Sequence, residues 1–172
     1  MTLRRIGFVA CLLPAFALLI AVTPPSHQDH QSLLNRQAPT LQEETDKLFA
    51  ATNQVRAEKG RSTLQKDARL MVAAQQYAEL MAAQDEMSHT LKGLTLVDKA
   101  KRVGYAYRKL SENIALNTDL DGRFVVNEQW MKSKGHRQNL LAADVSQIGV
   151  GVAGPSKRGK RYYYCQIFGA PL

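Results

Sequence analysis

The chain has 172 residues, enough for one domain of ordinary size plus a leader, because domains usually contain roughly 100 to 200 residues. This length disfavours a second core. Lysine and arginine outnumber aspartate and glutamate by 23 to 15, which gives a formal net charge of +8. The basic residues have no interleaved aromatic side chains on which bases stack, so the composition argues against a nucleic-acid partner.

The first 25 residues have the layout of an export signal. Arg4 and Arg5 precede an uncharged apolar run over residues 6–22, and a Thr-Pro-Pro sequence ends that run. We therefore predict a signal peptide over residues 1–25 and a protein exported to the periplasm or the extracellular space. A membrane anchor is the alternative, because the run is close to the ~17 to 25 residues that span a bilayer and no clear cleavage site is present. If uncleaved, this segment is the only membrane contact that we expect.

Residues 26–39 are polar and lack a hydrophobic period, so they are predicted to form a flexible linker ahead of one domain over residues 40–172. His27 and His30 in this linker belong to a solvated tail, since no further metal ligand lies close to them in sequence. Without the leader, 21 basic residues oppose 15 acidic ones, and the net charge is +6. That charge favours anionic partners such as wall acids or lipid headgroups, although a solubilising surface is the simpler explanation.

The two cysteines differ in their position relative to the leader. Cys11 lies within it, so the exported domain has only Cys165 and cannot form an internal disulfide. We place Cys165 on the interior face of the last strand, where a small apolar side chain packs well. A reactive or intermolecular role for this thiol is the alternative.

Two long helices are predicted at the start of the domain. Thr40 and Glu43 have the spacing of a capping box for the first helix, which ends at Gly60. The second helix is expected over about residues 64–87. Apolar residues that recur on one face of each helix are assigned to the core, and they are Leu41, Leu48, Ala51, Val55, Leu70, Met71, Ala74, Ala78 and Met81.

The rest of the domain combines helices with strands. A short helix is predicted over residues 95–103 with Gly104 as its left-handed stop, and residues 105–110 are irregular or form a short strand. Residues 148–153 and 161–168 are predicted to form an antiparallel hairpin, because both segments are β-prone and a turn-rich segment separates them. Helices followed by strands indicate an α+β domain with helices packed on an antiparallel sheet.

A further helix is expected between these segments. It starts at Asp119 or Asp121, either of which has a suitable capping side chain, and it is broken by Gly135. Its two core-facing residues, one turn apart, are Val126 and Trp130.

Two histidines and a glutamate stand beside turn-forming or helix-ending residues and form the candidate site. His89 directly follows the second predicted helix, Glu112 lies in a Ser-Glu-Asn-Ile-Ala segment, and His136 follows Gly135. Each residue alone has a simpler structural role, as a cap or as the partner of a carbonyl or an arginine. Together, two imidazoles and a carboxylate match the ligands of zinc or a similar divalent ion. Three neighbours are expected to fix the local backbone, and these are Asn113, Arg137 and Asn139.

Several short motifs follow one another between residues 40 and 168. They are Ser88-His89, Gly104-Tyr105, Glu112-Asn113-Ile114-Ala115, Trp130 with Ser133, Gly135-His136-Arg137-Gln138-Asn139-Leu140-Leu141, Ile148-Gly149-Val150-Gly151 and Tyr163-Tyr164-Cys165-Gln166-Ile167-Phe168-Gly169. Their order resembles the CAP superfamily of SCP-like proteins, which includes cysteine-rich secretory, antigen 5 and pathogenesis-related 1 proteins. The single cysteine of the exported domain is closer to the bacterial branch than to the disulfide-rich eukaryotic members.

The resemblance implies a three-layer α/β/α sandwich with a central antiparallel sheet and a cleft lined by two histidines and two acidic residues. By matched motif, the histidines are His89 and His136, and the first acidic residue is Glu112. The second acidic position falls on Ser133, and the nearest carboxylate, that of Glu128, lies earlier in the same predicted helix.

Two functions compete for this site. The leading hypothesis is an exported binding module at the cell envelope, with a lipid, sterol-like or wall-derived ligand and an optional zinc or other divalent ion held by His89, Glu112 and His136. The alternative is a metal-assisted hydrolase, either a peptidase or a wall-cleaving enzyme, in which the metal activates a water molecule. A Ser-His hydrolase ranks lower, because no glycine-flanked elbow presents a serine.

A third hypothesis is a structural interaction protein whose cleft has lost its role, because a fold does not by itself determine a function. Its contacts would depend on the basic residues near the predicted hairpin turn, and these are Lys157, Arg158, Lys160 and Arg161.

Overall fold

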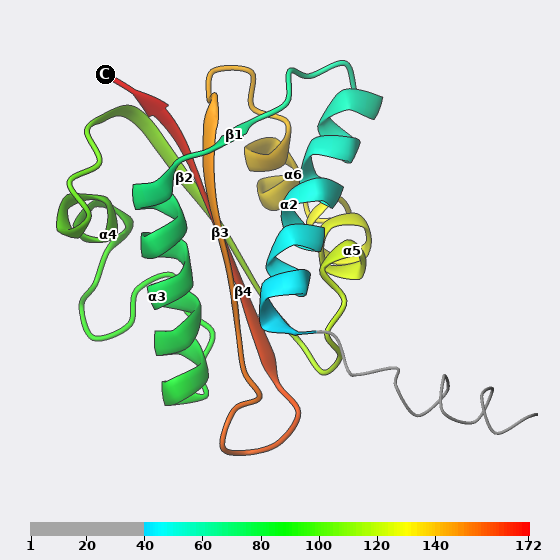
Figure 1. The fold of residues 1–172 in the computed structure, drawn as a ribbon, viewed down its shortest axis with the longest axis vertical. Helices are drawn as coiled ribbons and strands as arrows, with labels where there is room; N and C mark the ends of the chain where they lie inside the picture. The colour runs from blue at the N-terminus through cyan, green and yellow to red at the C-terminus, as the bar shows by residue number, and fades with distance from the viewer. Residues whose placement is uncertain (1–39) are drawn as a thin grey trace, which may run out of the picture. The chain divides into compact units, whose positions relative to one another are not determined.

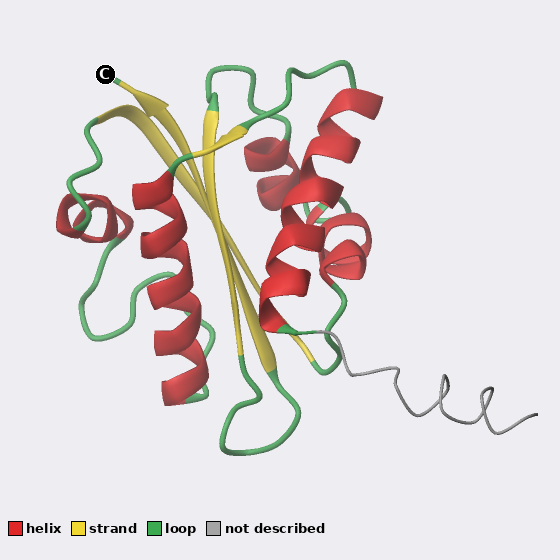
Figure 2. Ribbon diagram, in the orientation of Figure 1, coloured by secondary structure: helices red, strands yellow, loops and turns green. Residues whose placement is uncertain are grey.

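The computed structural model describes residues 40–172, which fold around a four-stranded sheet with the strand order β1-β3-β4-β2. The central strand β4 (Tyr162–Pro171) pairs antiparallel with β3 (Gln147–Ala153) on one side and with β2 (Tyr107–Asn117) on the other. β1 (Gln65–Lys66) adds a short parallel pairing to β3. Helices cover both faces of the sheet (Figure 1 and Figure 2), which confirms the predicted α+β class and the α/β/α sandwich.

One face of the sheet is covered by α2 (Leu41–Glu58), α5 (Gly122–Phe124), the π-helical turn η1 (Val125–Trp130) and α6 (Lys134–Leu140). Residues of α2, η1 and α6 share one hydrophobic cluster with the sheet. Successive strand residues point to opposite faces, so this cluster receives alternate residues of β4. These residues are Tyr164 and Phe168.

α3 (Ala68–Gln84) and α4 (Leu96–Arg102) cover the opposite face and pack on the other set of β4 side chains. Cys165 belongs to this set and is fully buried, which confirms its predicted place in the interior. Leu41 and Met71 are only partly buried. The other predicted core residues are buried, and they are Leu48, Ala51, Val55, Leu70, Ala74, Ala78, Met81, Val126 and Trp130.

Two glycines allow α3 to lie directly on β3. A Cβ atom added at Gly149 would lie 1.9 Å from the carbonyl oxygen of Leu70, and one added at Gly151 would lie 2.5 Å from Cα of Gln75. At this close approach the Gln75 side chain exchanges two hydrogen bonds with the backbone of Val152, each 3.1 Å long. The helix therefore satisfies polar groups along the outer edge of the strand.

Local capping groups set where the long helices begin. Thr40 and Glu43 form the predicted capping box of α2. The second helix begins at Ala68, because the Asp67 side chain accepts hydrogen bonds from backbone N–H groups of its first turn. The predicted start at Leu64 is wrong, since the residues before Asp67 are extended and include β1.

The segment between α3 and Glu112 differs from the prediction in one respect. Thr95 caps α4 and Gly104 has a φ of 66°, so the short helix and its stop are confirmed. Of the two expectations for residues 105–110, the strand is confirmed from Tyr107 on, but it is not short, because β2 continues well beyond Glu112. Residues 112–115 are all buried, so this part of the strand lacks the polar alternation that marks a half-exposed strand.

The predicted break between two helices near residue 135 is present, but Gly135 does not make it. The Asp121 side chain accepts a hydrogen bond from the backbone N–H of Phe124 and so caps α5, which confirms one of the two predicted helix starts. The helical segment then ends before Gly135, which lies inside the separate helix α6. A glycine inside a helix is tolerated at a modest cost, so its presence does not mark a boundary.

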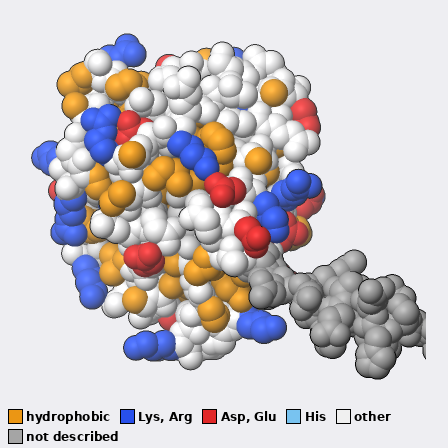
Figure 3. Space-filling model, in the orientation of Figure 1, with side chains coloured by type: hydrophobic (Ala, Val, Ile, Leu, Met, Phe, Trp, Pro, Cys, Tyr) orange, Lys and Arg blue, Asp and Glu red, His pale blue; other side chains and the backbone are white. Residues whose placement is uncertain are grey.

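The predictions of a leader over residues 1–25 and a linker over residues 26–39 lie outside the described residues. Within residues 40–172, no helix is long and apolar enough to cross a membrane. Figure 3 shows Lys and Arg side chains scattered over the drawn face and interspersed with acidic side chains. This face therefore has no continuous basic patch of the kind that follows a nucleic-acid backbone.

Candidate functional site

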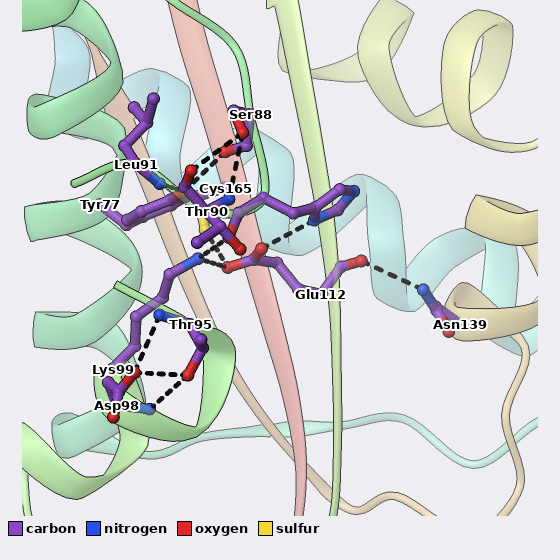
Figure 4. A network of polar contacts seen from close by, with 11 residues as sticks. Tyr77, Ser88, Thr90, Leu91, Thr95, Asp98, Lys99, Glu112, Asn139 and Cys165 are labelled. Atoms are coloured by element: carbon purple, nitrogen blue, oxygen red, sulfur yellow. Dashed lines mark hydrogen bonds and ion pairs between the residues drawn. The ribbon is translucent and has the colours of Figure 1, made fainter. Parts of the chain in front are cut away.

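Glu112 occupies β2 with its side chain only 3% exposed. Ile114, two residues further along the strand, packs in the cluster under α3 and α4, so Glu112 faces the same layer. The thiol of Cys165 lies 3.8 Å from Oε2 of Glu112 and donates toward it (Figure 4). Burial raises the pKa of the Cys165 thiol, which keeps it protonated as a donor. A carboxylate at this depth requires further charged or hydrogen-bonding partners.

Lys99 of α4 is the closest of these partners. Its ammonium lies 2.6 Å from Oε2 of Glu112 (Figure 4). The ammonium also donates to the carbonyl oxygen of His89 at 3.0 Å. The same ammonium sits over the ring of Tyr77, 3.0 Å from its centroid, and the lysine side chain is 2% exposed. Burial lowers the pKa of Lys99, and the negative charge of Glu112 opposes that effect.

His89 stands in the loop after α3 and is bound to the other oxygen of Glu112. Its Nδ1 lies 2.8 Å from Oε1, while 57% of its side chain is exposed. The Tyr77 hydroxyl holds this loop, because it donates to the carbonyl of Ser88 at 2.6 Å and accepts from the N–H of Leu91 at 3.1 Å. Burial raises the pKa of Tyr77, so the hydroxyl keeps the proton that it donates.

His136 lies on α6, on the other side of β2, and within residues 40–172 its ring is hydrogen-bonded to neither His89 nor Glu112. Asn113 donates to the carbonyl of His136 at 3.1 Å. Asn139 donates to the backbone carbonyl of Glu112 at 3.1 Å and to Oδ1 of Asn113 at 2.9 Å. Burial lowers the pKa of His136, and the charge of His89 lowers it further. The expected backbone-fixing roles of the two asparagines are confirmed, and α6 is held beside the carboxylate-bearing strand.

The two weaker candidates lie apart from these contacts. Glu128 is 45% exposed and pairs with Lys132 on the outside of η1. Ser133 precedes α6 and makes no capping hydrogen bond with its side chain. Within residues 40–172, neither side chain is hydrogen-bonded to His89, Glu112 or His136.

A profile of the CAP family, described as "Cysteine-rich secretory protein family", matches residues 49–168. The chain belongs to this family. The match extends from α2 to β4 and includes every residue of the site just described. The CAP membership predicted from the motif order is therefore confirmed.

The CAP region is similar to proteins from several bacteria. The Bacillus subtilis "Uncharacterized membrane protein YlbC" is 34% identical over 118 residues, which cover 68% of this chain and 32% of that protein. This chain thus spans about a third of the length of that relative. An outer surface protein from Borrelia burgdorferi has a TM-score of 0.69 at 21% identity, covering 79% of this chain and 98% of that one. An extracellular SCP-domain protein from Bacillus anthracis has a TM-score of 0.67 at 25% identity, covering 86% and 45%.

The metal site expected for this CAP domain does not fit the side chains as they are arranged. Within residues 40–172, no three His, Cys, Asp or Glu side chains form a group that could hold a metal ion. Both oxygens of Glu112 are already engaged, one by His89 and the other by Lys99. A divalent ion bound to this carboxylate would have to displace the Lys99 ammonium, which is also positively charged and lies 2.6 Å from Oε2 of Glu112.

Lys99 and Tyr77 were not predicted as site residues. The sequence contains a signal for Lys99, because Leu96, Lys99, Ala100 and Val103 have the i, i+3, i+4, i+7 spacing of one apolar helix face. A lysine on such a face requires a buried acidic partner. No comparable signal marks Tyr77, since its contacts depend on how the loop after α3 folds back over the helix.

Proposed function

We propose that this CAP-domain protein is exported and acts at the cell envelope as a binding module for a wall-derived ligand. The uncharged run over residues 6–22 supports export. So do the names of two similar proteins, one called a membrane protein and the other an extracellular protein.

The observation that carries the binding proposal is an exposed imidazole on a rigid, buried support. His89 is 57% exposed, while Glu112 and Lys99 behind it are 3% and 2% exposed. A ligand that bonds to an already fixed side chain costs little ordering entropy, and this favours affinity. The polar groups around His89 suit a polar wall fragment better than a lipid or sterol-like ligand, which requires a mainly apolar lining.

A hydrolase receives less support from the same contacts. Glu112 is poorly placed to serve as a base, because His89 and Lys99 engage its two oxygens and its side chain is only 3% exposed. Within the part of the chain that the structure describes, no serine hydroxyl is hydrogen-bonded to either imidazole. A nucleophilic mechanism normally requires such a pair within reach.

The test is co-sedimentation of the purified full chain with insoluble cell-wall material. We expect His89→Ala and His136→Ala each to weaken binding about tenfold, as the loss of one or two hydrogen bonds predicts. Glu128→Ala is the matched control, because that exposed carboxylate lies away from the site. Circular dichroism of each variant verifies that the fold is retained.

Equal binding by the wild type and both histidine variants would contradict the proposal. Preferential binding to phospholipid vesicles in a parallel assay would replace the wall-derived ligand with a lipid. Release of soluble wall fragments that stops with His136→Ala would identify a hydrolase instead.

A further inference from the structure

The feature that the family resemblance does not anticipate is a buried positive charge inside the site. The ammonium of Lys99 lies 2.6 Å from Glu112, under the His89 carbonyl and over the Tyr77 ring. These contacts come from α3, α4, β2 and the loop between α3 and α4, so the lysine is enclosed from several directions (Figure 4).

We propose that Lys99 is the internal cation of this site: it occupies the charge position that a divalent metal ion would need and, through Glu112, fixes His89 as a metal-independent ligand contact. The metal part of this inference stands on the contacts of Lys99 alone. The ligand part rests on the proposed binding function.

Displacement of Lys99 by a metal ion is unfavourable because the ammonium has nowhere to go. Its side chain is 2% exposed, and its three partners are a carboxylate, a carbonyl and an aromatic face, all of which favour a cation. A metal ion that took Glu112 would leave a buried charge without its counter-ion, which is among the most costly defects in a protein. Lys99 therefore lowers the affinity of the Glu112 carboxylate for a metal ion, and its positive charge also disfavours a second cation on the neighbouring His89 ring.

The same contacts determine which nitrogen of His89 faces outward as an acceptor. A carboxylate paired with an ammonium only accepts hydrogen bonds, so the hydrogen of the neutral imidazole lies on Nδ1, the atom 2.8 Å from Glu112. Nε2 is then left without a hydrogen. It accepts a hydrogen bond from a donor on the ligand, such as the hydroxyl or amide N–H of a wall polymer.

Isothermal titration calorimetry with Zn²⁺ tests the first part. All proteins carry His27→Ala and His30→Ala, so that any zinc bound has to be bound by residues of the described domain. The parent protein carries these two changes alone. We expect it to bind zinc no more tightly than the parent with His89→Ala and His136→Ala added. Lys99→Met is expected to bind at least about 100-fold more tightly, because no ammonium then opposes the metal. Lys101→Met, an exposed lysine change on the same helix, is the control and should behave like the parent.

Tight zinc binding by the parent that is lost with His89→Ala would overturn the proposal. So would equal zinc affinities of the parent and a folded Lys99→Met. If Lys99→Met does not fold, the comparison between the parent and the double histidine variant decides the question alone.

Nitrogen NMR of the imidazole rings tests the second part, because ¹⁵N shifts distinguish protonated from unprotonated ring nitrogens. At about pH 8 we expect the hydrogen of His89 on Nδ1 in the wild type and in Lys101→Met. The charge-free variant Lys99→Met/Glu112→Gln should show a mixture of both tautomers. A wild-type ring with its hydrogen on Nε2 would overturn this part. Neither measurement uses a wall-derived ligand, so the proposed function stands or falls separately in its own binding assay.

Discussion

At the scale of single residues, the position of the exposed imidazole depends on side chains that are themselves buried. His89 contacts solvent, but Glu112 holds its ring, Lys99 holds the carboxylate and Tyr77 holds the loop. Motif matching located His89, Glu112 and His136, because these residue types recur at recognisable places. Lys99 and Tyr77 act through contacts that no linear motif contains.

Single atoms also decide how closely α3 approaches the sheet. We expect Gly151→Ala to lower the free energy of unfolding by about 3 kcal/mol, because the new Cβ would lie 2.5 Å from backbone atoms of Gln75. Backbone atoms cannot rotate away as a side chain would, so the helix must shift. Urea denaturation of the wild type and the variant measures the change. A loss below about 0.5 kcal/mol would show that α3 relaxes freely away from β3.

At the scale of elements, α6 contains a glycine that no contact requires. A Cβ added at Gly135 meets nothing within 4 Å, and its φ is not positive. We expect Gly135→Ala to raise the free energy of unfolding by about 0.5 to 1 kcal/mol, because alanine restricts the unfolded chain and favours a helix. Urea denaturation checks this increase, with Gly151→Ala as the contrasting substitution. Destabilisation by Gly135→Ala would mean that α6 requires flexibility at this residue.

The elements whose ends carry capping groups were predicted best. Thr40 forms the predicted capping box of α2, and Asp121, one of the two predicted starts, caps α5, because a cap is a local interaction over about four residues. β2 was missed around Glu112 because helices cover both faces of that part of the strand. Its residues are therefore buried on both sides and do not alternate between polar and apolar. The Asp67 cap was overlooked because the apolar pattern begins at Leu64, before the residue at which the helix starts.

At the scale of the whole molecule, buried polar side chains connect elements far apart in sequence. Arg56 of α2 donates from Nη1 to the carbonyls of Leu140 and Ala142, at 2.7 and 2.9 Å. Glu44 of the same helix accepts from the N–H of Gly122 at 2.9 Å. These contacts hold the helical layer that positions His136.

His136 also links the site to the pH dependence of stability. Its pKa in the folded protein lies below the ordinary value of 6.5, so the unfolded chain takes up this proton at higher pH than the folded protein does. Between the two pKa values the unfolded state binds more protons, and the free energy of unfolding therefore falls as the pH falls.

We expect His136→Gln to lose less stability than the wild type between about pH 7.5 and about pH 5.5, as measured by urea denaturation at both pH values. Gln138→Ala, an exposed change on the same helix without a titrating group, should follow the wild type. Identical losses in all three proteins would show that His136 does not contribute to acid destabilisation.

The sequence by itself determined the α+β class, the cap of the first predicted helix, the glycine stop of the third, most core positions and three candidate site residues, because these depend on local periods or on motif order. Only the tertiary structure decided the environment of those three residues. Glu112 meets Lys99 across 13 positions, His89 across 23 and Cys165 across 53. Contacts over such separations form only when the layers pack, and here packing places an ammonium against the carboxylate that the donor set alone had assigned to a metal ion.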